Sequence, residues 1–244
     1  MKRYAFELSY NGRDYFGWQR QPHQVSIQEE IENALTKLNR NQSISVTGCG
    51  RTDTGVHAFH YVLHVDLPEH FPVEDLSFRL NKMLTKNIAI HSIKEVSSSF
   101  HARFDAVGRT YRYFVHQQKN PFKNDTSLFF PEALDIDAMN KAAGYLIGKK
   151  DFTSFSKLHT DVKTNICDVM KAVWIQTGSN ELYFEIKADR FLRNMVRATV
   201  GTLLEVGTGK LSPADILPIL EKKDRCEAKM SVPGHALFLW EINY

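Results

Sequence analysis

Cysteine is scarce in this 244-residue sequence, and the wide spacing of the cysteines argues against a structural zinc site and against a domain stabilised by disulfide bonds. Cys49, Cys167 and Cys226 are far apart and form no CxxC pair. Structural zinc sites use closely spaced cysteine pairs, and disulfide-stapled domains carry many cysteines. We therefore expect neither kind of site, and we expect a reducing compartment.

Long apolar runs are missing as well. No stretch approaches the ~20 apolar residues of a membrane span, and the N-terminus alternates like a strand where a signal peptide would have an apolar core. No Walker loop or GxGxxG fingerprint is present. The sequence therefore predicts a cytoplasmic protein without membrane association.

A large excess of one charge is also lacking, since 31 lysines and arginines oppose 28 aspartates and glutamates, for a net charge of +3. The total charge says little about a polyanionic partner, so the distribution of charge matters more. The apolar content of 43% is enough for a buried core, in one large domain or two of ordinary size.

The most informative feature that is present is the segment GRTDTGVHA at residues 50–58. It lies between an apolar stretch at 44–47 and an alternating one at 58–65, which predicts a loop joining two strands. Strict alternation would place every second residue on one sheet face: Phe59, Tyr61, Leu63 and Val65. The glycines permit close approach to a ligand, and Asp53 would be held on a rigid scaffold without being buried.

Two other interpretations of this segment exist. An aspartate in a glycine-rich loop is commonly a turn former that accepts hydrogen bonds from its own backbone. Cys49 and three nearby histidines also suggest a metal site. However, His57 and His60 would face opposite ways in a strand, and His60 and His64 would lie ~13 Å apart at ~3.3 Å per residue. A shared ion needs all its ligands at one point, so we expect no bound metal.

The whole chain alternates between predicted strands and helices. Strands are expected near residues 1–10, 44–47, 58–65, 88–96, 110–116, 169–176, 182–188 and 237–242. Helices are expected from a capping box at Ser26, over residues 76–84, near 136–147, over 191–205, and from a cap at Ser212. This order predicts an α+β fold of two similar halves, 1–105 and 106–244. Each half would have an antiparallel sheet flanked by helices, with an active-site cleft between the halves.

Residues 100–113 interleave four aromatic side chains with three arginines, a mixture that suits stacked bases and phosphates. Tyr111 and Tyr113 would share one face of a strand, and we expect Tyr113 to belong to the core. The loops at 117–124 and 157–165 carry basic, amide and hydroxyl groups that suit phosphate and sugar contacts. Ordinary solvated loops have the same composition.

The predicted helix after Asp189 has an apolar arc: Phe191, Leu192, Met195, Val196, Thr199, Val200 and Leu203. Arginines 190, 193 and 197 cluster beside this arc. They form either a solvated basic face or a group from which one arginine reaches Asp53. Such a pairing would keep the carboxylate charged as a nucleophile.

GRTDTGVHA resembles the active-site signature of the tRNA pseudouridine synthase A family. Further segments are similar to family blocks and follow the family's order: 9–19, 100–103, 109–113, 151–155, 191–197 with Gly201, and 232–239. The resemblance covers essentially the whole chain. Thr54 stands where the family more usually has alanine, and Ala236 stands where it usually has glycine. Neither departure removes a reactive group.

The resemblance implies an enzyme that converts uridine to pseudouridine in the anticodon arm of tRNA, typically at positions 38 to 40, without a cofactor and as a homodimer. Asp53 matches the catalytic aspartate and Tyr111 the tyrosine that stacks on the target base. Arg197 matches the basic residue paired with that aspartate. Arg51 matches an arginine that guides the flipped nucleotide, and Leu237 a leucine that lines the pocket.

The reaction needs few groups. It breaks the bond from N1 to C1′, turns the uracil, joins C5 to C1′ and releases the C5 proton. A carboxylate can add to C1′ or remove the 2′ proton, and the sequence does not choose between these routes. The base must be extruded and held, which suits stacking on Tyr111, whose hydroxyl can also relay the C5 proton.

Two rival functions are available. Aspartic proteases share the tripeptide at residues 53–55, but they need two carboxylates, and Gly-Cys-Gly-Arg stands here where an apolar strand would be expected. A non-catalytic RNA-binding protein would use the same basic loops and aromatic residues. It would leave Asp53 unexplained, because a carboxylate beside phosphates costs affinity.

Overall fold

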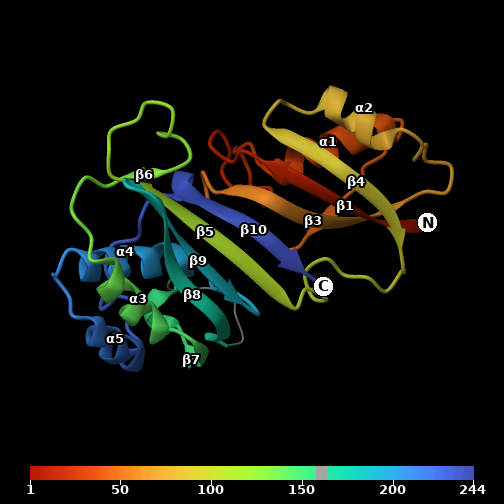
Figure 1. Cartoon of the computed structure of the whole chain (residues 1–244). Helices are drawn as coiled ribbons and strands as arrows, with labels where there is room; N and C mark the ends of the chain where they lie inside the picture. Colours follow the sequence, from red (N-terminus) through yellow and green to blue (C-terminus); the bar gives the residue numbers. More distant parts are fainter. Residues whose placement is uncertain (158–163) are drawn as a thin grey trace. The chain divides into compact units, whose positions relative to one another are not determined.

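The computed structural model describes residues 1–157 and 164–244. Most of the predicted loop at 157–165 therefore lies outside the described residues. The chain divides into two compact units, Met1–Val107 with Phe238–Tyr244, and Gly108–Leu237. Each unit combines a mostly antiparallel sheet with helices (Figure 1), which confirms the predicted α+β fold class.

The first unit is built on strands in the order β4–β1–β3–β10, with β2 beside β3. The bounds are β1 Lys2–Tyr10, β2 Val46–Gly48, β3 His57–Leu67, β4 Ile88–Val96 and β10 Leu237–Asn243. The pairs are antiparallel except that β10 runs parallel to β3. The last strand of the chain therefore returns to the first unit and lies beside the strand that follows the GRTDTGVHA loop.

Helices α1 (Ile27–Leu38) and α2 (Leu76–Met83) lie on one face of this sheet (Figure 1). Alternate residues of β1 are buried on that face: Tyr4, Phe6, Leu8 and Tyr10. The predicted cap of α1 is confirmed, because the Ser26 hydroxyl accepts a hydrogen bond from the backbone N–H of Glu29 (3.3 Å). Such a bond satisfies one of the N–H groups that a helix start leaves unpaired.

The strict alternation predicted for β3 is wrong at Phe59. Leu8 is opposite Tyr61, but Tyr10 is opposite Ala58, so β3 has one extra residue between these pairs. An extra residue of this kind is a β-bulge, and it reverses the alternation beyond it. Tyr61 is fully buried, whereas Phe59 is 60% exposed. Phe59 therefore faces away from the helices.

The second unit has the strand order β5–β9–β8–β7, with antiparallel pairs and with β6 parallel to β5. The strand bounds are β5 Gly108–His116, β6 Leu128–Phe129, β7 Gly148–Asp151, β8 Ile166–Gly178 and β9 Glu181–Ala188. The helices are α3 Ile136–Gly144, α4 Met195–Gly207 and α5 Ile216–Lys222. The short strands β6 and β7 have no counterpart in the sequence-based prediction.

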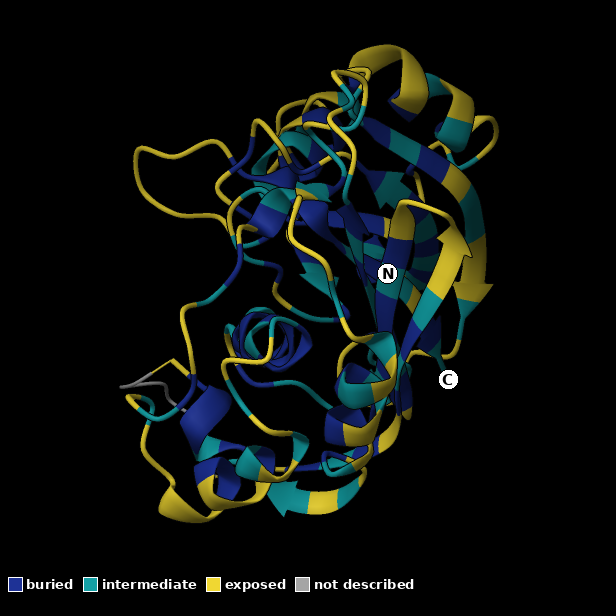
Figure 2. Ribbon diagram, turned by 60° about the vertical axis from the view of Figure 1, so that its left-hand side comes forward, coloured by how far each residue is buried: buried dark blue, intermediate teal, exposed yellow. Residues whose placement is uncertain are grey.

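Helix α4 begins later than the sequence predicts. Asn194 has a φ of 68°, in the left-handed region, so Phe191 and Leu192 precede the helix and do not belong to it. The helix itself is buried around most of its circumference and is drawn largely in dark blue in Figure 2. No helix within residues 1–157 and 164–244 is long and apolar enough to cross a membrane.

A buried histidine lies on the face of the first sheet that the helices leave uncovered. His64 is 6% exposed, and its Nδ1 accepts a hydrogen bond from the backbone N–H of Ala102 (3.0 Å). Burial lowers the pKa of His64 from 6.5 to about 4, and the nearby Arg3 and His101 act in the same direction. The imidazole is therefore neutral in the folded protein at neutral pH.

Acidification should destabilise the protein through His64. The folded pKa of about 4 lies below the ordinary value of 6.5, so the unfolded chain takes up the proton first. The stabilisation is full above pH 6.5 and is lost as the pH falls toward 4. Linkage predicts a loss of about 2 kcal/mol in the free energy of unfolding between about pH 7 and pH 5. Urea unfolding at the two pH values measures this loss.

The matched control is His64→Gln, because the glutamine oxygen can accept the Ala102 N–H but does not titrate. The variant should lose less stability than the wild type over the same pH range, and the difference isolates His64 from the other ionisable groups. Equal losses in both proteins would contradict the assignment.

Candidate functional site

The GRTDTGVHA segment forms the loop that joins β2 to β3, as the sequence predicts. Asp53 is partly exposed at the middle of this loop. Arg51 is exposed and donates from Nε to the Gln19 side-chain oxygen (3.2 Å). Thr52 is buried and shares a hydrogen bond with the Tyr10 hydroxyl (2.8 Å). In this loop Thr52 is therefore buried, whereas its neighbours Arg51 and Asp53 are accessible to solvent.

Residues 12–18 hold this loop in place through backbone hydrogen bonds. The N–H of Trp18 donates to the carbonyl of Thr52 (3.3 Å), and the N–H of Gly55 donates to the carbonyl of Tyr15 (3.2 Å). Within the loop, the N–H of Val56 donates to the carbonyl of Asp53 (3.1 Å). The backbone on both sides of Asp53 is therefore fixed by partners that do not depend on its side chain.

Two glycines make this close packing possible. A Cβ on Gly12 would lie 1.9 Å from the carbonyl oxygen of Val56, and a Cβ on Gly17 would lie 2.3 Å from that of Thr52. Gly17 also has a φ of +88°, which side chains disfavour. No other residue type fits at either position without moving the loop.

A cluster of aromatic side chains contacts the start of the loop. Tyr61 donates from its hydroxyl to the carbonyl of Gly50 (2.5 Å), and its ring stacks on Trp18 with 4.1 Å between centroids. Tyr10 packs against the same pair of rings. Because these rings are buried and packed on one another, they restrict movement at the start of the loop.

In the second unit, Tyr111 lies on β5 and is partly exposed. The ring of Phe191 meets the Tyr111 ring edge to face, with 5.0 Å between centroids and 83° between planes. Such a contact restricts the orientation of the tyrosine ring. Phe191 can make it from the irregular segment before α4, where the sequence predicted a helix.

Arg197, in the first turns of α4, fixes the C-terminal segment of the same unit. Its Nε donates to the carbonyl of Val232 (2.7 Å), and the N–H of Val232 donates back to the carbonyl of Arg197 (3.3 Å). One turn later, a Cβ on Gly201 would lie 2.0 Å from the carbonyl oxygen of Met230. The segment therefore lies directly on the helix backbone.

Tyr113, on β5, also holds the C-terminal segment in place. It is fully buried, which confirms the prediction that it belongs to the core, and its hydroxyl donates to the carbonyl of Pro233 (3.0 Å). Burial raises the pKa of Tyr113 well above its ordinary value, so the phenol stays a donor. Leu237 follows this segment and is buried as well.

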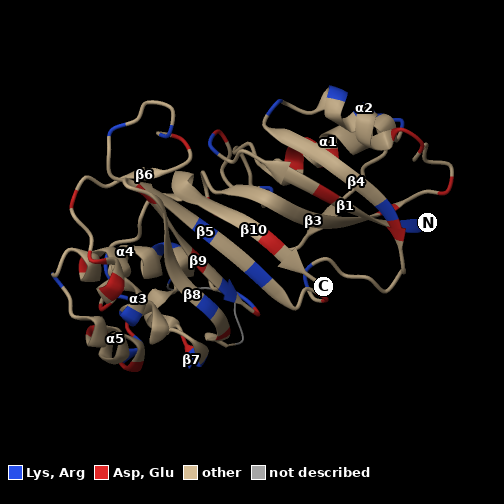
Figure 3. Cartoon of the chain, in the orientation of Figure 1, with Lys and Arg blue, Asp and Glu red and all other residues tan. Residues whose placement is uncertain are grey.

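The arginines of residues 100–113 take different positions. Arg109 donates from Nη1 to the carbonyl of Asp189 (2.8 Å). Arg112 extends from the opposite face of β5 to Tyr113 and pairs with the nearly buried Glu185 (2.6 Å), which Lys171 also contacts (2.6 Å). Both basic residues of β5 are blue in Figure 3. Arg112 therefore has a structural partner within its own sheet.

Among the described residues, no group of three or more histidine, cysteine, aspartate or glutamate side chains is placed to hold a metal ion. Both Cys49 and Cys167 are buried, and burial raises the pKa of the Cys167 thiol to about 12. Cys167 is therefore a neutral core residue and not a nucleophile.

The sequence model of the tRNA pseudouridine synthase family matches residues 8–105 and 142–244 of this chain. The chain belongs to this family. It is 50% identical to tRNA pseudouridine synthase A of Parabacteroides distasonis, over 100% of this chain and 96% of that protein. The identity is also 50% to the Porphyromonas gingivalis protein of that name, over 100% and 98% of the two chains. For the Bacillus subtilis protein it is 40%, over 97% of each.

The family match settles the class of reaction. The protein is an isomerase that converts uridine in tRNA to pseudouridine. The aspartic protease and the non-catalytic RNA-binding protein considered from the sequence are thereby set aside.

The sequence-based reasoning missed the residues that position the loop. Residues 9–19 resemble a family block, but the sequence does not predict their contact with residues 50–56. The available signal was the pair Gly12 and Gly17 among large aromatic residues. Paired glycines in such surroundings indicate a close approach of two backbones.

Gly17→Ala tests whether this packing positions the loop. The new Cβ would overlap the carbonyl oxygen of Thr52, so we expect the loop to shift. Pseudouridine formation in tRNA should fall by roughly tenfold or more, because a displacement of about 1 Å of a positioned group can cost about a hundredfold in rate. The initial rate of pseudouridine formation measures the effect.

Gly148→Ala is the matched control. Gly148 has a φ of +98°, but nothing lies within 4 Å of its added Cβ. The control therefore carries the backbone strain of about 1–2 kcal/mol without the overlap. It should retain the wild-type rate, and equal rates for both variants would contradict the proposed role of the Gly17 packing.

Proposed function

We propose that this enzyme isomerises uridines in the anticodon arm of tRNA, at positions 38 to 40, and that Asp53 is its catalytic carboxylate. One observation carries the assignment: Asp53 is a partly exposed carboxylate on a loop whose backbone is hydrogen-bonded on both sides. When a group is accessible to substrate and already positioned, its reorganisation during the reaction costs little free energy.

The first step is the loss of the glycosidic bond between N1 and C1′. The Asp53 carboxylate either adds to C1′ or removes the 2′ proton to give a glycal, and both routes need a single ionised carboxylate beside the ribose. The freed uracil turns and C5 bonds to C1′, which releases the Asp53 carboxylate from C1′ in the first route and requires the proton to return to C2′ in the second. The C5 proton then leaves, and N1 takes up a proton. The reaction redistributes bonds within one nucleotide, so it consumes no cofactor.

The remaining assignments concern the extruded nucleotide. Tyr111 is proposed to stack on the target uracil and to relay the C5 proton, and its contact with Phe191 supports the role because it orients the ring. Arg51 is proposed to guide the flipped nucleotide, since it is exposed beside Asp53. Leu237 is proposed to line the base pocket. The pairing of Arg197 with Asp53 stays a prediction.

Two further proposals concern the protein as a whole. We propose that it works as a homodimer in which one tRNA arm contacts both subunits, because doubling a chain of net charge +3 enlarges the basic surface. We also propose a cytoplasmic location, where tRNA is found and where the three cysteines remain thiols.

Asp53→Asn tests the catalytic assignment. The substitution keeps the size of the side chain but removes the carboxylate. We expect the variant to bind tRNA with wild-type affinity and to release no tritium from tRNA labelled at uracil C5. Filter binding and tritium release, measured on the same preparation, give the two readouts.

Asp137→Asn serves as the control, because Asp137 is an exposed aspartate in the first turn of α3 and its loss changes the net charge equally. It should release tritium at the wild-type rate, and mapping of its product should find pseudouridine at positions 38 to 40. Normal tritium release by Asp53→Asn would refute the catalytic role, and modification elsewhere in the tRNA would refute the assigned positions.

A further inference from the structure

The loop between β5 and β6, residues 117–127, carries an aromatic ring that packing within the protein does not explain. Phe122 is 92% exposed, more than any other large apolar side chain in the described part of the chain. Such a ring contributes little to the stability of the fold, because almost none of its surface leaves water on folding. None of the residues proposed above for the reaction belongs to this loop.

The backbone on both sides of Phe122 is ordered by hydrogen bonds within the loop. The Asn120 side-chain oxygen accepts from the N–H of Phe122 (3.0 Å), and the Asn120 carbonyl accepts from the N–H of Lys123 (3.2 Å). An asparagine that bonds the backbone two residues on stabilises a turn. The Lys123 carbonyl then accepts from the N–H groups of Thr126 (3.1 Å) and Ser127 (3.0 Å). Phe122 therefore lies on a hydrogen-bonded turn.

The ends of this loop are attached to the second sheet. His116, the last residue of β5, is 2% exposed, and its Nδ1 shares a hydrogen bond with the Ser127 hydroxyl (2.9 Å). Lys123 forms an ion pair with Glu181, the first residue of β9. Figure 1 shows the loop extending beyond the end of β5. The loop therefore has a fixed base on the strand that also carries Tyr111.

The chemistry of this loop favours RNA over a protein as its partner. Its polar side chains are mainly lysines, amides and hydroxyls, and Asp125 is its single carboxylate. Lysine and amide groups bind phosphate and sugar oxygens, and an exposed aromatic ring stacks on an unpaired base. The centre of a protein–protein interface would need further large apolar side chains, whereas Phe122 is the only aromatic residue of the loop.

The position of the loop separates it from the target nucleotide. Tyr111 and His116 both belong to β5 and are five residues apart, which is ~17 Å at ~3.3 Å per residue. Phe122 lies beyond His116 in the loop. A base that stacks on Phe122 therefore belongs to a different nucleotide from a base that stacks on Tyr111.

We propose that Phe122 stacks on an unpaired base of the tRNA and that the exposed Lys119 contacts a phosphate beside it. The loop thereby holds the substrate at a second nucleotide, away from the target uridine. The contact is the same before and during the reaction, so it lowers KM without changing kcat. Because the turn is already ordered, little free energy is lost in forming the contact. The inference rests on the proposed function, which places the target base at Tyr111.

Phe122→Ala in the full-length enzyme tests the stacking contact. The KM for tRNA should rise roughly tenfold with kcat unchanged, because the loss of one stacked base weakens binding to this extent without affecting the chemistry. Tritium release from tRNA labelled at uracil C5, measured over a range of tRNA concentrations, gives both constants. Phe122→Trp should keep the wild-type KM because indole also stacks. Phe122→Leu, which is apolar without a flat aromatic face, should behave like Phe122→Ala.

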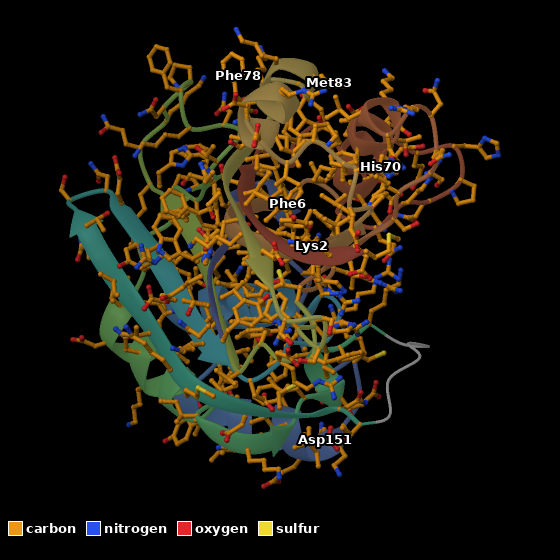
Figure 4. The ribbon with its side chains drawn as sticks, turned by 90° about the vertical axis from the view of Figure 1, so that its right-hand side faces the viewer. Lys2, Phe6, His70, Phe78, Met83 and Asp151 are labelled. Atoms are coloured by element: carbon orange, nitrogen blue, oxygen red, sulfur yellow. The ribbon has the colours of Figure 1, made fainter. Side chains whose placement is uncertain are left out.

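Phe78→Ala is the matched control for the loss of an exposed ring. Phe78, labelled in Figure 4, is 63% exposed and belongs to α2 of the first unit. This variant should have the wild-type KM and kcat. Thermal unfolding of Phe122→Ala should also match the wild type, because the ring is almost fully exposed. A changed KM in Phe122→Ala then reports on binding and not on folding.

Lys119→Gln tests the phosphate contact separately. Filter binding at several salt concentrations should show weaker binding and a slope of log K against log salt that is smaller by about 1, because one phosphate contact is lost. Lys141→Gln is the control, since Lys141 is an exposed lysine in the last turn of α3 and its loss changes the net charge equally. Its salt slope should equal that of the wild type, and equal slopes for both variants would contradict the Lys119 contact.

The outcomes separate this inference from the proposed function. An unchanged KM for Phe122→Ala would overturn the stacking contact and would leave a protein as the partner of the ring. A wild-type KM for Phe122→Leu would show that apolar contact suffices and would also overturn stacking. A raised KM with wild-type kcat supports the loop contact whether or not Asp53→Asn releases tritium. Failure of the catalytic assignment is therefore visible independently.

Discussion

The close approach of two backbone segments, residues 12–18 and residues 52–56, is the constraint on which the proposed catalytic loop depends. Gly12 and Gly17 allow this approach because a Cβ at either position would overlap a carbonyl of the loop. The resulting hydrogen bonds use backbone groups only, so they fix the position of Asp53 while its side chain remains partly exposed. A carboxylate held in this way meets its substrate without first ordering a loop.

In the second unit, a glycine likewise allows two backbone segments to approach closely. Gly201 lets the segment at 230–233 lie on α4, and Arg197 and Tyr113 then secure that segment through its carbonyl groups. The segments that resemble family blocks within each unit therefore pack on one another. Their residue types follow from local packing as well as from the chemistry proposed for Asp53 and Tyr111.

Much of the fold could be predicted because its signals are local. The Ser26 cap, the strand at 88–96 and the buried Tyr113 all follow from short-range pattern and chemistry. The failures occur where a single residue changes the backbone. A bulge turned Phe59 outward, and the left-handed Asn194 delayed the start of α4. The contact of Gly17 with Thr52 joins residues far apart in sequence, so periodicity could not reveal it.

We infer that the loop around Asp53 is ordered before tRNA binds. Amide hydrogen exchange of the tRNA-free enzyme tests it most directly at Trp18, Gly55 and Val56, whose N–H groups donate to backbone carbonyls in this region. We expect protection close to that of Cys49, which donates to the carbonyl of Val62 on β3. Exchange of these three amides at the rate of an unstructured loop, with protection appearing only when tRNA is added, would contradict it.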